Sequence, residues 1–413
     1  MNDLIIKQVN CYDSSLQKFL ENRDVLVRDG RIVSITDKTL DLPPGSDVIA
    51  GKEKYLIPGL FNLHSHPQRR HVSLNEKSGP FRMGAAAVEN LPDTQRMAYA
   101  IRNIWTETLL EGVTTIRAAG SKNYLNIELR DAVEMGIMAG PNVIATGPIH
   151  ATTGGHATVG IDGAMEVDGV DEVRKAVRLA LKKEADWIKL CVTGGLAGIH
   201  KGEHPSMVQF TFAEVEAAVD EAHRKHRKVM VHCMASDAAK MAIKAGVDCI
   251  EHGNLLSEEV IALMKEKRTS FVPTMSGIWK VYLREHNAGN ERVAKLLADV
   301  IFPHKDVVRN AIKAGILIGT GTDTLGSVID EMKFFIECGM TKAQALNSAT
   351  IDSARIVDRQ DRTGSIEAGK DADLVLLAGN PLENSEEFRH IEKVLLKGRA
   401  FEPKFLSVFN VGS

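Results

Sequence analysis

The feature that most constrains the fold is a regular alternation of short apolar strands with helical segments between about residues 56 and 357. Several helical segments carry start signals, including the capping-box patterns that begin at Thr211 and Thr341. Strands that alternate with helices form a parallel sheet, and eight of them suffice to close a (β/α)8 barrel. We therefore expect an α/β fold with a TIM-like barrel over residues 56–363. The expected barrel strands are 59–64, 114–117, 142–145, 187–192, 229–232, 249–252, 270–273 and 316–319.

The two ends of the chain have a different texture, with short strands and turns. Asp29-Gly30 is a hairpin signal between the β-rich runs 24–28 and 31–35. The segment after residue 363 returns to strands, at 374–377 and 394–397. We therefore expect residues 1–55 and 364–413 to pair into a small β-sandwich domain beside the barrel.

The composition is that of a globular protein with a large core, with 44% hydrophobic and 25% charged residues. The net charge of −3 gives no reason to expect nucleic acid as a partner. No apolar run approaches the roughly 20 residues of a membrane-spanning helix, and no signal peptide is visible. The five cysteines are an odd number and form no CxxC pair, which suits a reducing compartment. These features predict a cytoplasmic protein that binds neither nucleic acid nor membranes.

A pair of histidines ends the first expected barrel strand. In an extended strand, His64 and His66 share one face about 6.6 Å apart. Two imidazoles so placed can bind one divalent ion through bonds of about 2.0–2.1 Å. Taken alone, the pair is equally compatible with an ordinary turn.

Four further polar residues fall on or after other expected strands: Lys189 on the fourth, His232 on the fifth, His252 on the sixth and Asp323 after the eighth. Active sites of barrel enzymes lie at the carboxyl ends of the strands. Five strands that bring histidines, a lysine and an aspartate to one rim predict a metal centre there.

Lys189 is the unusual member of this set because its neighbours Trp187, Ile188 and Leu190 are apolar. A charged amine in such surroundings is costly, and nearby metal cations would favour the neutral form. A neutral amine can take up carbon dioxide as a carbamate, whose two oxygens can bridge two metals. The alternatives are a lysine that reaches the surface and one that pairs with an acid.

In order and spacing, this set resembles the amidohydrolase superfamily, in its binuclear branch with a carboxylated lysine. Thr153-Gly154-Gly155-His156 and Thr193-Gly194-Gly195 are similar to the imidazolonepropionase-related, prolidase-like dipeptidases. The resemblance extends over nearly the whole chain. Its other motifs are Gly59, Gly112-Val113-Thr114-Thr115, Ile250-Glu251-His252-Gly253, Gly319-Thr320-Gly321-Thr322-Asp323 and Gly369-Lys370-Asp371-Ala372-Asp373-Leu374.

The resemblance implies two divalent metal ions, with Zn²⁺ favoured by the nitrogen-rich ligands, although manganese and iron remain possible. It implies the metal ligands His64, His66 and Asp323 for one ion, His232 and His252 for the other, and N-carboxylated Lys189 as the bridge.

It also implies that Asp323 moves a proton from water to the leaving amine, and that His156 donates a hydrogen bond to the substrate carbonyl oxygen. Arg117, at the end of the second strand, would either bind a substrate carboxylate or form a buried ion pair. Met234 stands where the dipeptidases usually have a tyrosine that binds the substrate carbonyl. The loop that follows Asp323 is shorter than in that subgroup. Amide hydrolysis is therefore better supported than peptide hydrolysis.

Other polar residues lie near the expected rim or on helices. The segments 67–90 and 275–290 are candidates for a loop that closes over the pocket. Candidate pocket-wall residues are Arg69, Arg70, His71, Arg82, His200 and His204, and expected surface residues are His223, His226, His286, His304 and His390.

We therefore expect a metal-dependent hydrolase that cleaves an amide C–N bond in a small molecule, either a dipeptide or an N-acyl amino acid. Alternatives are a hydrolase of cyclic amides, lactones or carbamates, and a mononuclear deaminase of the same superfamily. A third class is a barrel without catalytic activity that serves in assembly. Relatives suggest a homo-oligomer, by analogy only.

Overall fold

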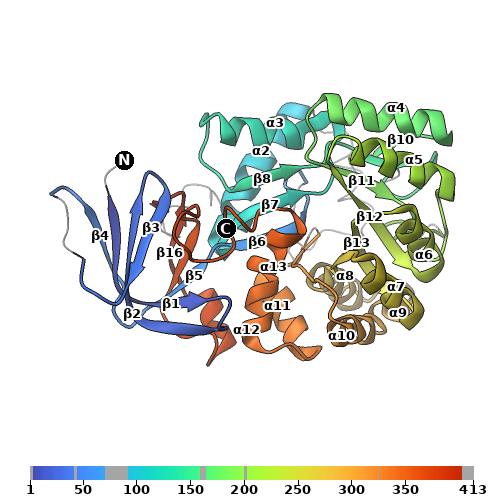
Figure 1. Ribbon diagram of the computed structural model, residues 1–413. Helices are drawn as coiled ribbons and strands as arrows, with labels where there is room; N and C mark the ends of the chain where they lie inside the picture. Colours follow the sequence, from blue (N-terminus) through green and yellow to red (C-terminus); the bar gives the residue numbers. More distant parts are fainter. Residues whose placement is uncertain are drawn as a thin grey trace.

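The computed structural model describes residues 3–40, 44–69, 92–158, 164–199, 202–323 and 325–401. Figure 1 shows two parts, a β-sheet built from both ends of the chain and a group of parallel strands surrounded by helices.

The sheet of the chain ends has eight strands among the described residues. Its order is β17-β16-β15-β5-β1-β2-β3, and β4 pairs with β1. The expected hairpin joins β2 to β3, and both turn residues have positive φ angles, +49° at Asp29 and +79° at Gly30. The strands are β1 (Leu4–Asp13), β2 (Lys18–Arg28), β3 (Arg31–Thr36), β4 (Asp47–Ala50), β5 (Tyr55–Pro58), β15 (Leu374–Leu377), β16 (Ile391–Leu396) and β17 (Arg399–Phe401).

The two ends meet where β15 pairs antiparallel with β5, with Leu376 opposite Leu56. Alternate residues of these strands point into a separate apolar core. Instead of the two sheets of a sandwich, the described residues form one connected sheet that curls. Hydrogen bonds from Ile32 N to Lys370 O (2.9 Å) and from Ala372 N to Gly30 O (2.8 Å) join the start of β3, at one edge, to the segment before β15.

The second part contains two parallel sheets. One has the order β6-β7-β8 and the other β10-β9-β11-β12-β13-β14. Seven of the eight expected barrel strands are present, and β9 and β10 were not expected. The strands are β6 (Leu60–Ser65), β7 (Val113–Ala118), β8 (Asn142–Ala145), β9 (Ile149–Ala151), β10 (Ala164–Glu166), β11 (Trp187–Cys191), β12 (Lys228–Ala235), β13 (Cys249–Leu255) and β14 (Ser270–Val272).

The expected eighth strand, 316–319, is not a regular strand. It forms a single bridge, Ile318 with Phe271, and then Leu63 N donates to Thr320 O at 2.7 Å. This segment therefore lies between β14 and β6. On the other side, Asp186 N donates to Ala145 O at 2.8 Å. No continuous ladder closes the two sheets into a barrel within the described ranges.

Helices pack around the parallel strands (Figure 1). The capping boxes at Thr211 and Thr341 are present, and Ser257 caps α7 by accepting from Val260 N. No helix in the described part of the chain is long and apolar enough to cross a membrane. The helices are α2 (Asp93–Asn103), α3 (Leu125–Glu134), α4 (Gly169–Lys182), α5 (Phe212–His223), α6 (Ser236–Ala245), α7 (Glu258–Lys267), α8 (Met275–Asn287), α9 (Glu291–Ile301), α10 (His304–Ala314), α11 (Val328–Glu337), α12 (Lys342–Ser348) and α13 (Ile351–Ile356).

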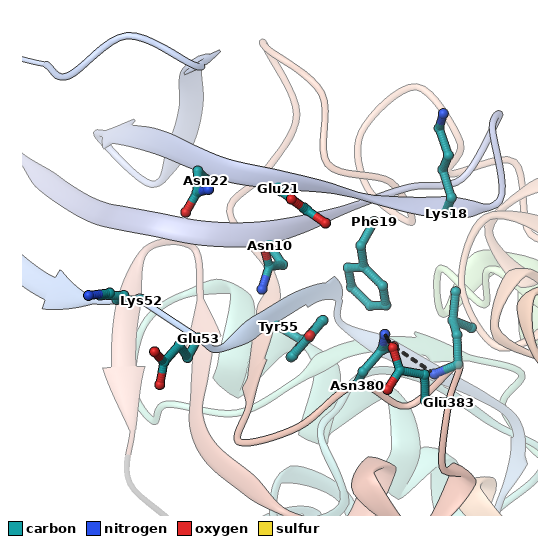
Figure 2. Close-up of a pocket in the computed structure, with 11 residues that line it drawn as sticks. Asn10, Lys18, Phe19, Glu21, Asn22, Lys52, Glu53, Tyr55, Asn380 and Glu383 are labelled. Atoms are coloured by element: carbon teal, nitrogen blue, oxygen red, sulfur yellow. Dashed lines mark hydrogen bonds between the residues drawn. The ribbon is translucent and has the colours of Figure 1, made fainter.

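A groove of about 520 Å³ opens on the sheet of the chain ends, between β1, β2, β5 and the turn around Asn380. Figure 2 shows Phe19 and Tyr55 at its centre, with ring centroids 4.9 Å apart. Charged residues of both signs surround this aromatic pair. None of the residues expected in the metal centre lines the groove.

Candidate metal centre

Four histidines from three parallel strands form one buried cluster. The ring centroids are 5.3 Å apart for His64 and His66, 4.8 Å for His64 and His252, and 4.6 Å for His232 and His252. All four rings are buried. Their convergence follows from the parallel arrangement, because the carboxyl ends of neighbouring strands meet at one rim.

Asp323 lies beside the first two histidines. Its backbone N–H donates to His64 O at 2.8 Å, and its Oδ1 lies 3.5 Å from His66 Nε2. Ligand atoms of His64, His66 and Asp323 all lie within 4.8 Å of one another. This three-residue group therefore has the compactness that one metal ion requires.

In two of the histidines, the Nδ1 atom contacts a side chain for which the sequence indicated no role. His64 Nδ1 lies 2.7 Å from Glu251 Oε2, and His252 Nδ1 lies 2.7 Å from Thr274 Oγ1. These contacts leave both Nε2 atoms for a metal. The backbone is left-handed at His252 (φ +71°) and at Thr274 (φ +57°), a rare conformation for a β-branched residue.

Backbone carbonyl groups hold the other two rings. His66 Nδ1 lies 3.4 Å from Gly120 O, which leaves Nε2 for a metal. In His232 the arrangement is reversed, because Nε2 lies 3.2 Å from Gly194 O and Nδ1 is left. Carbonyl or carboxylate partners of this kind orient metal-binding histidines in known metalloproteins.

Lys189 is buried (2% exposed), and its Nζ has no hydrogen-bond partner among the described residues. Both alternatives for this lysine are thereby excluded in the described structure, since it neither reaches solvent nor hydrogen-bonds to an acid. Burial is the main cause that lowers its pKa. A buried amine without a partner is costly, and uptake of carbon dioxide would supply the missing interactions.

The electrostatics favour neutral ligands. Burial is the largest cause that holds the pKa of each of the four histidines well below its usual value, and the charge of Lys189 adds to it. Neutral imidazole is the form that binds metals. The donor set of imidazole nitrogens, a carboxylate and an orphaned amine thus fits a pair of divalent ions.

Arg117 lies beneath the cluster and is fully buried. Its Nη2 is 2.7 Å from Glu251 Oε1, its Nε donates to Leu63 O at 2.7 Å, and its guanidinium lies 4.6 Å from the centroid of the Trp187 ring. The structure therefore supports the buried ion pair and corrects the assignment of Arg117 to substrate binding. Glu251 could have been suspected only from its position directly before His252.

His156 lies next to the cluster, with its ring stacked on His232 at a centroid distance of 4.2 Å. Its Nδ1 is 2.6 Å from Glu203 Oε1. The side chain of His156 is 10% exposed, so the ring is not fully enclosed. Glu203 was not expected, because it stands 47 residues away from its partner in the chain.

Met234 does not lie at the open rim. It is buried in an apolar cluster with Ile278, Leu297 and Ile301, because α8 and α9 pack over β12 at this point. The structure therefore supports packing and corrects its assignment to substrate contact. Cys191 is likewise buried in an apolar cluster.

The candidate pocket-wall and surface residues differ in where the structure places them. Arg69 Nη1 lies 3.6 Å from Asp323 Oδ1, whereas His204 is exposed and contacts Ser206. His304, expected at the surface, is buried beside Asn254 at the start of α10, and burial lowers its pKa to about 4. The other histidines expected at the surface (His223, His226, His286 and His390) are exposed. Arg70, His71, Arg82, His200 and most of the loop 67–90 lie outside the described residues.

Comparison with known proteins places this arrangement among hydrolases. The model of the amidohydrolase family matches residues 55–401. Ochratoxinase from Aspergillus niger is 31% identical over 408 residues, which cover 91% of this chain and 81% of that protein. The family and the solved structures of its relatives imply a TIM-like barrel with an additional domain.

Two solved structures extend the similarity. A prolidase complexed with N-methylphosphonate-L-proline is 29% identical, with a TM-score of 0.86 over 97% of this chain and 100% of that one. A Xaa-Pro dipeptidase with bound methionine is 30% identical, with a TM-score of 0.85 over 97% and 100% of the two chains. These neighbours agree with a prolidase-like subgroup.

Proposed function

The chain belongs to the amidohydrolase family, whose members related to it hydrolyse amide C–N bonds, and we propose that it is a metal-dependent hydrolase of dipeptides or N-acyl amino acids. The observation that carries the proposal is the Nζ of Lys189, which lacks a hydrogen-bond partner among the described residues. It is buried near four histidines, each with one ring nitrogen held by a neighbouring group and the other left for a metal. A buried amine of this kind has no role in an apolar core, and it fits a carbamate.

Two divalent ions, with zinc as the first choice, would be held by His64, His66, Asp323, His232, His252 and N-carboxylated Lys189. When bound, such ions supply an activated water and polarise the carbonyl group of a substrate. Carboxylation joins the carbon of carbon dioxide to the Lys189 nitrogen, and the proton released goes to solvent.

Asp323 is suited to move protons because its side chain is 27% exposed while it stays 3.5 Å from His66. A carboxylate oxygen there can accept a proton from the attacking water and deliver it to the leaving amine. His156 is stacked on His232, and its Nδ1–H faces the Glu203 carboxylate, so its Nε2 would donate to the carbonyl oxygen with the ring protonated on both nitrogens.

The substrate class is supported by the molecules bound to two relatives, N-methylphosphonate-L-proline in a prolidase and methionine in a dipeptidase. Both are built on an amino acid. In this chain, Arg69 is a cation 3.6 Å from Asp323, and it would face the carboxylate of such a substrate.

The test is hydrolysis of a library of dipeptides, with Xaa-Pro members, and of N-acyl amino acids, by zinc-loaded protein with bicarbonate. Metal content is measured on the same sample, and Asp323→Asn is the matched control for contaminating peptidases. Two equivalents of metal with release of free amino acids by the wild type alone would support the proposal. A protein with two metals that releases none would contradict it and favour cyclic amides, lactones or carbamates.

We also propose a cytoplasmic homo-oligomer in which residues 1–55 with 364–413 form one domain and 56–363 the other. All five cysteines are buried and free, as suits a reducing compartment. Light scattering of the purified protein would decide the oligomeric state.

A further inference from the structure

We propose that Glu203 is a positioning residue, which fixes the ring of His156 so that its Nε2 faces the substrate. The proposal rests on the proposed function, in which His156 contacts the substrate carbonyl oxygen. It assigns a specific role to the loop after β11, which carries Glu203.

The Glu203 carboxylate binds three donors. Oε1 lies 2.6 Å from His156 Nδ1 and accepts from Gly195 N at 2.7 Å, and Oε2 accepts from Gly198 N at 2.8 Å. Burial raises the pKa of Glu203, but the hydrogen bonds, led by that from His156, lower it below its usual value overall. An ionised carboxylate is therefore held next to the ring.

The glycines of this loop are needed for the contact. A Cβ on Gly195 would lie 2.2 Å from His156 Cε1, and a Cβ on Gly198 would lie 2.2 Å from Glu203 Oε2. Side chains at either position would push the carboxylate and the ring apart. Gly195, the second glycine of the pair that resembles the dipeptidase motif, thus allows the loop to pack closely against His156.

Two contacts together define the orientation of the ring. Stacking on His232, with an interplanar angle of 22°, sets the plane of His156. The Glu203 contact then selects one of the two ring orientations that a half-turn about the Cβ–Cγ bond exchanges, because it fixes which edge of the imidazole faces the loop. Nδ1 and Nε2 lie on opposite sides of the Cβ–Cγ axis, so Nε2 is left for the substrate, to which it donates when both ring nitrogens carry a proton. Without Glu203 the ring can turn over and present carbon in place of nitrogen.

The kinetic test is a double-mutant cycle with Glu203→Gln and His156→Ala on the zinc-loaded enzyme and its preferred amide substrate. We expect Glu203→Gln to lower kcat about 10- to 100-fold with a small change in KM. In the His156→Ala background the same change should have little further effect, because the residue through which Glu203 acts is gone. Equal losses in both backgrounds, or a normal kcat for Glu203→Gln, would overturn the proposal.

Two controls distinguish a role of Glu203 in orienting His156 from a role in stabilising the loop alone. Glu166→Gln removes an exposed carboxylate that accepts from Gly154 N at 3.0 Å, in the loop that carries His156, and it should leave kcat unchanged. Metal content and thermal unfolding of Glu203→Gln should match the wild type. If unfolding shifts by more than a few degrees, Glu203→Asp, which keeps the charge, should recover stability but not kcat.

A second readout does not depend on hydrolysis. In ¹⁵N-histidine-labelled protein, the His156 ring signals are those missing from His156→Ala. We expect its Nδ1–H proton to lie far downfield in the wild type and to move upfield in Glu203→Gln, with Glu166→Gln unchanged. An unchanged signal in Glu203→Gln would refute the contact itself. If the wild type cleaves no amide, this signal still decides whether Glu203 holds the ring.

Discussion

Glu251 and His64 form a buried contact, with 2.7 Å between Oε2 and Nδ1, at the base of the histidine cluster. The other oxygen of the same carboxylate lies 2.7 Å from Arg117 Nη2, and none of the three side chains is more than 2% exposed. One residue thus orients the His64 ring, a proposed metal ligand, and neutralises a buried arginine. Its loss should affect metal binding and folding together.

Glu251→Gln is therefore expected to weaken metal binding about 10- to 100-fold, because the amide orients His64 poorly. It should also lower the free energy of unfolding of the metal-free protein by about 3–5 kcal/mol, because Arg117 loses its buried partner. Competitive zinc titration and urea unfolding measure the two effects.

The control for this change is Glu386→Gln, which removes an exposed partner of Lys333. It should leave both stability and metal affinity close to those of the wild type, because solvent screens an exposed ion pair. Equal stability losses in the two variants would show that the buried pair is not important for folding.

The alternation of strands and helices predicted the parallel strands because it depends on local patterns of residues. The pattern failed at 316–319, where a glycine-rich segment approaches its neighbours too closely for regular pairing. A Cβ on Gly321, just after it, would lie 2.4 Å from Val272 Cγ1. Such close approach is set by tertiary packing, which a single sequence does not reveal.

For the site, the histidines that the structure brings together were predicted, whereas the residues that hold them were not. His64 and His252 could be predicted as site residues because they are polar residues that interrupt apolar runs at the ends of strands. The supporting contacts join residues far apart in the chain, such as His64 with Glu251, separated by 187 positions. The same reason explains His304, whose burial depends on where α10 packs.

Asp323→Asn should lower kcat by a factor of about 10²–10⁴, the usual contribution of an acid–base group. The amide oxygen can still act as a weak ligand, so much of the metal should remain. Steady-state kinetics and metal analysis on the same sample provide the measurement. Near-normal turnover with full metal content would mean that another group moves the proton.

With the proposed carbamate bridge at Lys189, the change Lys189→Ala should lose that ligand and with it most of the bound metal. Because the truncation leaves space beside the metals, a small carboxylate such as propionate should restore part of the activity. Absence of any rescue across acetate, propionate and butyrate would count against a carbamate at this position.

Lys189→Met is the matched variant because it keeps the volume and removes the amine. Since Nζ is buried without a hydrogen-bond partner among the described residues, the metal-free Lys189→Met protein should unfold at the same or a higher temperature than the metal-free wild type. A lower temperature would indicate that the amine stabilises the metal-free protein.

The ion pair of Glu221 on α5 with Arg174 and Arg178 on α4 should make the stability of the protein depend on pH below about pH 5. Arg178 donates to Glu221 Oε1 at 2.6 Å and Arg174 donates to the same oxygen at 2.8 Å. The hydrogen bond from Arg178 is the largest cause that lowers the pKa of Glu221, to about 2. An unfolded glutamate has a pKa of about 4.3, so the unfolded state binds more protons as the pH falls.

The stabilisation from Glu221 is therefore fully present above about pH 5 and is lost as the pH falls toward 2. Because Arg178 is 62% exposed, we expect Glu221→Gln to cost only about 1 kcal/mol at pH 7. The difference from wild type should be clearly smaller at pH 3.5 than at pH 7, because Glu221 is then partly protonated in the unfolded chain. Urea midpoints at both pH values measure this, with exposed Glu216→Gln on the same helix as control. A difference that stays constant with pH would show that the lost contacts are those of packing and not of charge.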